Sequence, residues 1–247
     1  MKTITVCNQK GGVGKTTTVL TIAAGLVRRG YRALVVDFDP QCTTTALTAG
    51  RPDKTILDVI NGTRAAAVVI VHADQGFDVL PGDAGLASVP ADFQPGQLRE
   101  LLQPIAQLYD YCVIDTGPGL SLLSISALCA ADHVIIPCET DIGSLQGLDA
   151  IAGTLGAVRP LNKGLRSVGV LVTKYRGYNI DKTMLPIFEE RAAEMDATVY
   201  KTVIRLSNSF KTSQLFRDSI FDTDPRGNGS ADYTAFLDEF MKGGTNG

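Results

Sequence analysis

A glycine-rich segment close to the start of the sequence carries the residues with the clearest chemistry. Residues 6–18 read VCNQKGGVGKTTT. Glycines let backbone N–H groups converge on phosphate oxygens, and a lysine followed by hydroxyl residues is typical of a phosphate-binding loop. Lys15 is expected to contact the β- and γ-phosphates of a nucleotide, Thr16 to bind Mg²⁺, and Thr17 to contact the α-phosphate. The residues expected to form the backbone cradle are Gly11, Gly12, Val13 and Gly14.

A second lysine in this loop, Lys10, departs from the usual pattern. The pattern G-x-x-x-x-G-K-[ST] begins with glycine, whereas here its first position is Gln9 and Lys10 follows it. Lys15 already occupies the place of the phosphate lysine. The residue types leave two interpretations of Lys10 open, namely a lysine with a role of its own and a solvated loop charge.

Two further segments place carboxylates after runs of apolar residues. One reads VVDFDPQCTT over residues 35–44, and the other reads DYCVIDTGPG over residues 110–119. Because a carboxylate cannot favourably touch a phosphate, Asp37 and Asp39 are expected to face Mg²⁺ and its waters. Asp115 is expected to reach the same ion through water, as the second acidic motif of phosphate-loop proteins does. For Asp39 the alternative is that it caps a helix following the next residue, a proline.

These motifs need strands and helices that bring them together. Short β-branched runs, typical of strands buried on both faces, occupy residues 3–8, 32–39, 77–83, 111–117, 132–139 and 167–175. Helical patterns lie at residues 16–29, 97–108, 121–130, 143–158, 181–195 and 231–242. This alternation predicts an α/β fold with a doubly wound, mostly parallel sheet and helices on both faces, which is the P-loop NTPase architecture. Ligands of such sheets bind beyond the carboxyl ends of the strands, where the three motifs fall.

Length and composition limit the class of protein. The chain has 247 residues, 45% of them hydrophobic, and we expect one domain over residues 1–247. The net charge of −3 excludes binding of nucleic acid through bulk charge, but not through a local basic patch. Residues 50–76 and 222–230 are expected to be the loosest parts, and the tail over residues 242–247 is expected to be frayed.

Cysteine usage and apolar runs bear on the compartment. The five cysteines include no C-x-x-C pair, and the N-terminus shows no apolar signal core, which favours a reduced, cytoplasmic chain. With two histidines in the sequence, a histidine-based metal site is not expected. The longest apolar runs fall short of the ~20 residues that span a bilayer, so we expect a soluble protein.

The loop sequence KGGVGKTT resembles the deviant P-loop of the ParA/MinD family of ATPases. The resemblance extends over nearly the whole chain: the phosphate loop, a D-x-D-P-Q segment at residues 37–41, Asp115, and the ending FKTSQLFRDSIFDTDPRGNGSADYTAFLDEF at residues 210–240. It implies that Lys10 reaches across a dimer interface to the phosphates bound by a partner subunit. It also implies that Asp39 orients the attacking water while Asp37 supports the metal shell. Together with Lys15, Lys10 and Asp39 are thus the residues expected to act in hydrolysis.

The switch II segment departs from the family pattern. The family usually has D-x-P-P where this chain has Thr116-Gly117-Pro118-Gly119 after Asp115. The extra glycines predict a more pliable loop.

The nucleotide base is expected to be adenine. GTPases of the common type recognise guanine through the Asp of an N-K-x-D motif at the end of a late strand. In this chain that strand end reads LVTKYRGYN over residues 171–179 and has no such acid. ATP and Mg²⁺ are therefore the expected cofactors. Thr173 and residues 205–208 are expected to border the base.

Within the family, the sequence favours the DNA-partitioning branch, whose members bind nonspecific DNA as ATP-dependent homodimers. The cations expected to contribute to that surface are Lys174, Arg176, Arg205, Lys211 and Arg217. The first predicted strand begins at Lys2, without a preceding helix-turn-helix, so specific operator binding is not expected. A ParB-like or cargo-adaptor protein is expected to stimulate the slow hydrolysis of ATP. The protein is expected to be cytoplasmic and associated with the nucleoid.

The alternative is a MinD-like, membrane-associated positioning ATPase. Members of that type end in a basic amphipathic helix, whereas this chain ends TAFLDEFMKGGTNG, with acids at Asp238 and Glu239. Anionic lipid would repel such a helix. We therefore expect no stable membrane association.

Overall fold

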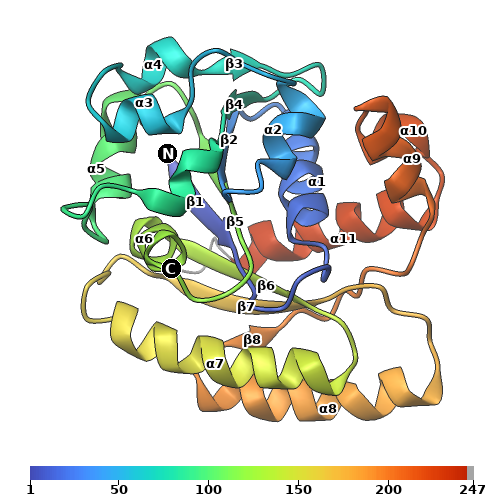
Figure 1. Ribbon diagram of the computed structural model, residues 1–247. Helices are drawn as coiled ribbons and strands as arrows, with labels where there is room; N and C mark the ends of the chain where they lie inside the picture. The colour runs from blue at the N-terminus through green and yellow to red at the C-terminus, as the bar shows by residue number, and fades with distance from the viewer. Residues whose placement is uncertain (244–247) are drawn as a thin grey trace.

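An eight-stranded sheet forms the centre of the computed structural model, which describes residues 1–243 (Figure 1). The strand order is β3-β4-β2-β5-β1-β6-β7-β8, and neighbouring strands are parallel except for β3 and β4. This confirms the mostly parallel sheet that the sequence predicts. The strands are β1 (Lys2–Val6), β2 (Ala33–Phe38), β3 (Val71–His72), β4 (Asp78–Leu80), β5 (Tyr111–Thr116), β6 (His133–Cys138), β7 (Ser167–Val172) and β8 (Thr198–Val199).

Helices cover both faces of the sheet, which confirms the doubly wound arrangement. The α-helices are α1 (Lys15–Arg28), α2 (Thr43–Thr48), α3 (Ile56–Ile60), α4 (Ala66–Val69), α5 (Gln97–Leu102), α6 (Leu122–Ala130), α7 (Ile142–Val158), α8 (Asn179–Glu194), α9 (Ser209–Phe216), α10 (Ile220–Thr223) and α11 (Asn228–Gly243). Two short 3₁₀ helices are η1 (Ala84–Ser88) and η2 (Gln103–Ile105). Among the described residues, none of the helices is long and apolar enough to cross a membrane.

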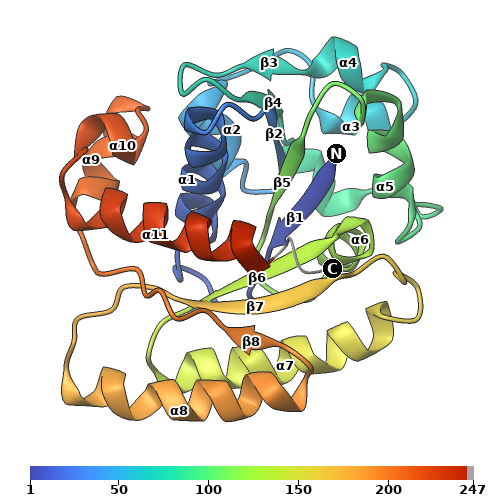
Figure 2. The same ribbon diagram turned by 180° about the vertical axis from the view of Figure 1, so that it is seen from behind.

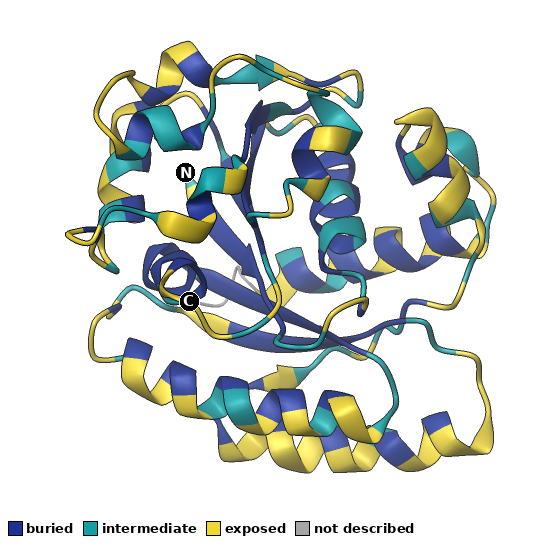
Figure 3. Ribbon diagram, viewed as in Figure 1, coloured by how far each residue is buried: buried dark blue, intermediate teal, exposed yellow. Residues whose placement is uncertain are grey.

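Alternate residues of each central strand pack against opposite helical layers. In β2, Val35 lies in a cluster with residues of α1 and α11, whereas Leu34 and Val36 pack with residues of α3, α4, α5 and α6. In β7, Leu171 belongs to the first layer, and Val170 packs with residues of α7 and α8. Figure 2 shows α11 lying across the sheet beside α1, and Figure 3 shows buried strands between helices with exposed outer faces. Burial on both faces explains why these strands are almost continuously apolar.

The parallel register brings the three motifs to one edge of the sheet. β5 lies between β1 and β2, and Asp115 is paired with Val6 on one side and with Asp37 on the other. The phosphate loop follows β1 directly, so the loop and both acidic segments converge at the carboxyl ends of three adjacent strands. This is the position predicted for a ligand of a doubly wound sheet.

Several segments differ from the sequence-based expectations. The helix expected over residues 97–108 is shorter, because α5 ends at Leu102 and η2 follows with Pro104, which cannot donate the backbone hydrogen bond of an α-helix. The segment 50–76 holds α3, α4 and β3 rather than a loose loop. α3 begins with a reciprocal capping box between Thr55 and Asp58, a signal that the sequence carries.

The C-terminal segment also contains more helix than expected. Residues 222–230 contain the end of α10 and the start of α11, joined by hydrogen bonds from the Ser230 hydroxyl to the carbonyls of Ile220 and Asp224. Of the tail expected to be frayed, Lys242 and Gly243 belong to α11. Residues 244–247 lie outside the described residues.

Candidate nucleotide site

The phosphate loop has the backbone conformation that its glycines predict. Gly12 and Gly14 adopt φ angles of 78° and 93°, in the left-handed region that L side chains rarely adopt. Gly14 is the N-cap of α1, so the first N–H groups of this helix point into the loop. A helix N-terminus that opens on a glycine loop favours a bound anion. The loop expected to cradle phosphate therefore has both the dipole and the free N–H groups that this role requires.

Lys15 lies at the floor of the loop. Its side chain is buried, and its Nζ donates a hydrogen bond of 3.1 Å to the carbonyl of Lys10. Burial lowers the pKa of Lys15, while the negative charges of Asp115 and Asp39 act in the opposite direction. Among the described residues, no carboxylate forms an ion pair with Lys15, whose hydrogen-bond partner is the Lys10 carbonyl. A buried ammonium of this kind is suited to offset the charge of a phosphate.

Asp115 has one carboxylate oxygen without a hydrogen-bond partner. Its Oδ2 accepts hydrogen bonds of 2.7 Å from the hydroxyls of Thr16 and Thr44, whereas its buried Oδ1 has no partner among the described residues. Burial, reinforced by the charge of Asp37, raises the pKa of Asp115 to about 7. A cation beside the unpaired oxygen would stabilise the charged form.

These groups fit a Mg²⁺ ion held mainly by nucleotide and water. Thr16 supplies a hydroxyl at the phosphate loop, and Asp115 supplies the unpaired oxygen beside it. In the described part of the chain, no cluster of three or more carboxylate, histidine or cysteine side chains could hold a metal. Mg²⁺ commonly uses few protein ligands and completes its octahedron with phosphate oxygens and waters.

Both carboxylate oxygens of Asp37 accept hydrogen bonds from nearby residues. Its Oδ2 accepts hydrogen bonds of 2.7 Å and 2.6 Å from the Thr45 N–H and hydroxyl, and its Oδ1 accepts one of 3.3 Å from the Asp39 N–H. Burial raises the pKa of Asp37, although the Thr45 hydrogen bonds lower it. The carboxylate thus ties β2 to α2, and its expected place in the metal shell stays a prediction.

Asp39 does not cap the helix that follows Pro40. Its Oδ1 accepts a hydrogen bond of 2.9 Å from the Gln41 N–H, which closes a tight turn. The N-cap of α2 is Cys42, whose φ of 51° is left-handed. The alternative of a capping role at α2 is therefore wrong, and the water-orienting role stays a prediction.

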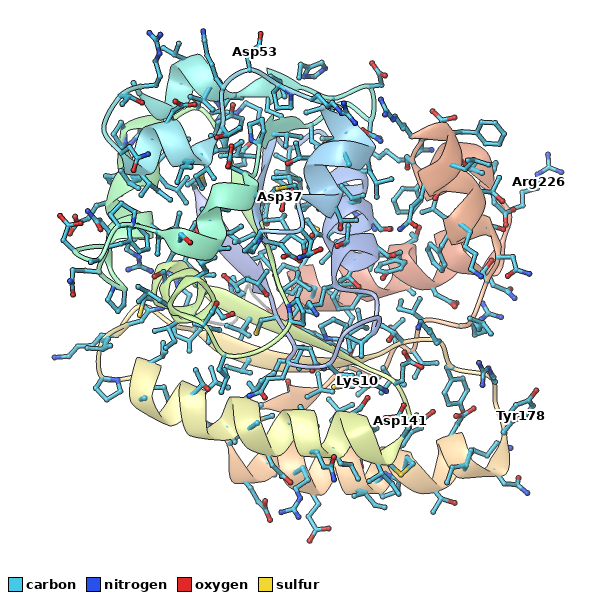
Figure 4. The ribbon with its side chains drawn as sticks, in the orientation of Figure 1. Lys10, Asp37, Asp53, Asp141, Tyr178 and Arg226 are labelled. Atoms are coloured by element: carbon cyan, nitrogen blue, oxygen red, sulfur yellow. The ribbon has the colours of Figure 1, made fainter. Side chains whose placement is uncertain are left out.

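Lys10 has a defined partner at the start of α7. It forms an ion pair with Asp141, the N-cap residue of α7, whose Oδ1 also accepts a hydrogen bond of 2.8 Å from the Ser144 N–H. Burial tends to raise the pKa of Asp141, but the hydrogen bonds from Lys10 and Ser144 lower it overall. Figure 4 shows Lys10 beside Asp141 at the start of α7. The role of Lys10 across a dimer interface stays a prediction.

A cavity of about 210 Å³ adjoins the phosphate loop where the base is expected. Thr173 lines it and donates a hydrogen bond of 2.9 Å to the carbonyl of Val13. Arg205, Leu206 and Ser207 also line the cavity, and so does Phe210, which the sequence did not single out. Asn208, at the end of the expected segment, is not among the lining residues.

Three of the five expected DNA-contacting cations, Lys174, Arg205 and Lys211, line the base cavity. Lys174 donates hydrogen bonds of 2.6 Å to the Gly12 carbonyl and 2.8 Å to Glu139. Arg205 is paired with Asp232, and both Lys174 and Arg205 line the base cavity. Arg176 and Arg217 do not line this cavity, and both are exposed, as are Arg205 and Lys211. Contact of these five cations with DNA stays a prediction.

Three further residues at the site were not predicted from the sequence. Thr44 supplies a hydroxyl to Asp115, and Gln214 donates a hydrogen bond of 3.0 Å to the hydroxyl of Thr17, the residue expected at the α-phosphate. Asp141 carries a local signal, because an aspartate three residues before a serine at a helix start is typical of an N-cap. The other two have no local signal, since their partners lie far away in sequence.

A backbone phosphate cradle between β1 and α1, with a lysine on its floor and a carboxylate at the next strand end, defines a P-loop NTPase. A family model described as an AAA domain matches residues 1–167. The chromosome-partitioning ATPase Soj of Thermus thermophilus is 34% identical over 246 residues, which cover 98% of this chain and 96% of that protein. The sporulation initiation inhibitor protein Soj of Bacillus subtilis is 32% identical, with coverage of 98% and 99%. The chain therefore belongs to the ParA/Soj group of the ParA/MinD family of P-loop ATPases, as its loop sequence predicts.

A solved structure extends this comparison to ligands. The crystal structure of cobyrinic acid a,c-diamide synthase from Mycobacterium smegmatis with bound ADP and magnesium has a TM-score of 0.85 and 26% identity to this chain. The match covers 100% of this chain and 96% of that one. A second structure of the same enzyme, with the same TM-score of 0.85, contains an ATP analog and magnesium. These ligands confirm the cofactors predicted for this chain, ATP and Mg²⁺.

Proposed function

We propose that this protein is an ATP-dependent dimerising switch that binds nonspecific DNA and hydrolyses ATP slowly to partition or position a cargo. The cargo is a plasmid, a chromosome origin or a large protein assembly. The observation that carries the proposal is the pair of lysines in one phosphate loop. Lys15 lies at the floor of the cradle, whereas Lys10 reaches Asp141 at the start of α7 and is 30% exposed. Because Lys10 lies outside its own cradle and is partly exposed, it is available to a second nucleotide bound by a facing copy of the chain.

Each step of hydrolysis has a group in this site. Lys15 and the loop N–H groups would bind the phosphates and offset their charge. Thr16 and Asp115, whose Oδ1 has no partner among the described residues, would hold a Mg²⁺ ion. When bound, Mg²⁺ neutralises charge that develops on the β- and γ-phosphate oxygens. Asp39 orients the attacking water. A partner protein, ParB-like or a cargo adaptor, accelerates this slow reaction.

Exposed apolar side chains around the site favour a second copy as the dimer partner. Leu120, Ile142 and Tyr178 are 49%, 72% and 62% exposed. They follow β5, β6 and β7, and therefore lie at the same edge of the sheet as the phosphate loop. A dimer formed through this edge would bury these side chains and bring Lys10 to the partner's phosphates.

DNA binding is proposed for the dimer rather than for the single chain. Arg176, Lys211 and Arg217 are exposed, and a second copy would double the number of cations on a continuous surface. The Thermus thermophilus relative is a chromosome-partitioning ATPase, which supports DNA as the matrix. We therefore infer a cytoplasmic, nucleoid-associated protein without stable membrane association.

The test combines DNA retention with vesicle sedimentation. With ATP and Mg²⁺, the protein is expected to be retained on nonspecific duplex DNA and not on anionic vesicles. ADP should release it, because the switch requires the triphosphate. Pelleting with anionic vesicles without retention on DNA would instead establish the MinD-like alternative.

A further inference from the structure

Gly117 leaves open the space in which the carboxylate of Asp39 lies. Gly117 follows β5, and a Cβ atom built on it would lie 2.8 Å from Oδ1 of Asp39 and 3.2 Å from its Cγ. Carbon and oxygen atoms without a bond between them do not approach this closely without repulsion. Any side chain at position 117 would therefore force Asp39 or the switch II loop to move.

The backbone conformation of Gly117 does not itself require glycine. Gly119, in the same loop, has a φ of 88° and needs glycine for its backbone, whereas Gly117 is not among the residues with positive φ. The close approach of the Asp39 carboxylate is thus the reason for glycine that the structure offers at position 117.

Asp39 is also held in this place from its other side. Its Oδ1, the atom closest to the missing Cβ, accepts the 2.9 Å hydrogen bond from the Gln41 N–H. The residue is only 8% exposed, so little water competes for this hydrogen bond. Burial lowers the pKa of Lys15, and the negative charge of Asp39 acts against this lowering. Asp39 therefore lies within electrostatic reach of the phosphate lysine.

We propose that Gly117 is a positioning residue for ATP hydrolysis, which gives Asp39 the space from which it orients the attacking water. The inference rests on the proposed function, because it assumes that Asp39 acts on water. A side chain at position 117 displaces the carboxylate without touching the phosphate cradle. Hydrolysis is sensitive to such a displacement, since a misplacement of about 1 Å can cost about 100-fold in rate.

The first experiment tests the contact itself and does not depend on activity. Thermal unfolding is measured for the parent, Gly117→Ala, Asp39→Ala and the double variant. Gly117→Ala is expected to lower the midpoint by about 3 °C or more in the parent, because overpacking destabilises. The same change should have little effect in the Asp39→Ala background, where the obstructing carboxylate is gone. An equal fall in both backgrounds would overturn the contact.

The second experiment separates positioning from binding. Gly117→Ala is expected to lower kcat for ATP by about 10-fold or more, with the Kd for ATP unchanged. In the Asp39→Ala background, Gly117→Ala should cause no further loss of hydrolysis. If Asp39→Ala is inactive while Gly117→Ala hydrolyses ATP at the parental rate, the positioning role is wrong although the proposed function stands.

A glycine elsewhere in the chain provides the control for replacing glycine by alanine. Gly156→Ala is the matched control, because a Cβ at this exposed position of α7 meets no atom within 4 Å. It should retain the parental kcat. If Asp39→Ala, with Gly117 intact, hydrolyses ATP at the parental rate, Asp39 does not orient the water. The proposed role of Asp39 and the positioning role of Gly117 would then both be wrong.

Discussion

Lys10 and Asp141 form an ion pair that joins the phosphate loop to the start of α7. Their side chains are 30% and 43% exposed, so water screens the attraction between them. A partly exposed pair of this kind contributes at most about 1 kcal/mol to stability. It can therefore be exchanged when a stronger anion, such as a triphosphate on a facing subunit, comes within reach of the lysine.

Replacement of Lys10 tests its role across the dimer interface. Lys10→Ala should bind ATP within about threefold of the parent, because the cradle, Lys15 and Thr16 remain and only an exposed ion pair is lost. It should lose ATP-dependent dimerisation, measured by light scattering, and with it the retention on DNA. Lys163→Ala, which removes an exposed lysine beyond the other end of α7, is the matched control. A Lys10→Ala protein that dimerises as well as the parent would make Lys10 an ordinary loop residue.

Removal of the charge of Asp141 should have the opposite effect. Asp141→Asn keeps a residue that caps α7 well but releases Lys10. The dimer with ATP is expected to be up to about fivefold tighter at low salt, since the competing ion pair is gone. Asp149→Asn, on the same helix and paired with Arg191, controls for the change in net charge. Unchanged or weaker dimerisation in Asp141→Asn alone would show that the ion pair does not compete.

Lys15 is expected to be essential for nucleotide binding. Lys15→Ala removes the ammonium on the floor of the cradle, so the affinity for ATP should fall by about 100-fold, in line with the value of hydrogen bonds to charged groups. Isothermal calorimetry with ATP and with GTP measures this loss. The parent should bind ATP, and tight binding of GTP alone would contradict the assignment of adenine. Retention of the parental affinity in Lys15→Ala would place the phosphates elsewhere.

Much of the nucleotide site follows from local sequence signals. Gly12 and Gly14 need left-handed backbone, and an apolar run that ends in Asp115 marks a buried strand end. Because parallel strands end at the same edge of a sheet, the convergence of the loop with Asp37 and Asp115 could be predicted before the structure was known. The order of the strands in the sheet is not contained in any local pattern.

Contacts between distant segments could not be predicted. The Thr16 and Thr44 hydroxyls meet on one oxygen of Asp115, although the three residues belong to different elements. The fit of Asp39 over Gly117 likewise depends on how two strand ends pack, and a single sequence carries no signal of it. The short helices α3 and α4 were missed for a different reason, since helices of this length show little periodicity.

At the opposite edge of the sheet, His133 hydrogen bonds with Ser167 at 2.8 Å and packs edge-on against Phe240. Burial lowers the pKa of His133 from its ordinary value of 6.5, Asp132 acts against this, and Lys2 and Arg166 act with it. Below about pH 6.5 the unfolded chain therefore binds a proton that the folded chain resists, and stability falls as the pH falls.

In urea unfolding at about pH 7.5 and about pH 5.5, His133→Gln should show a smaller fall in stability than the parent. His72→Gln, at the exposed histidine, is the matched control, and an equal change in both variants would contradict the assignment to His133.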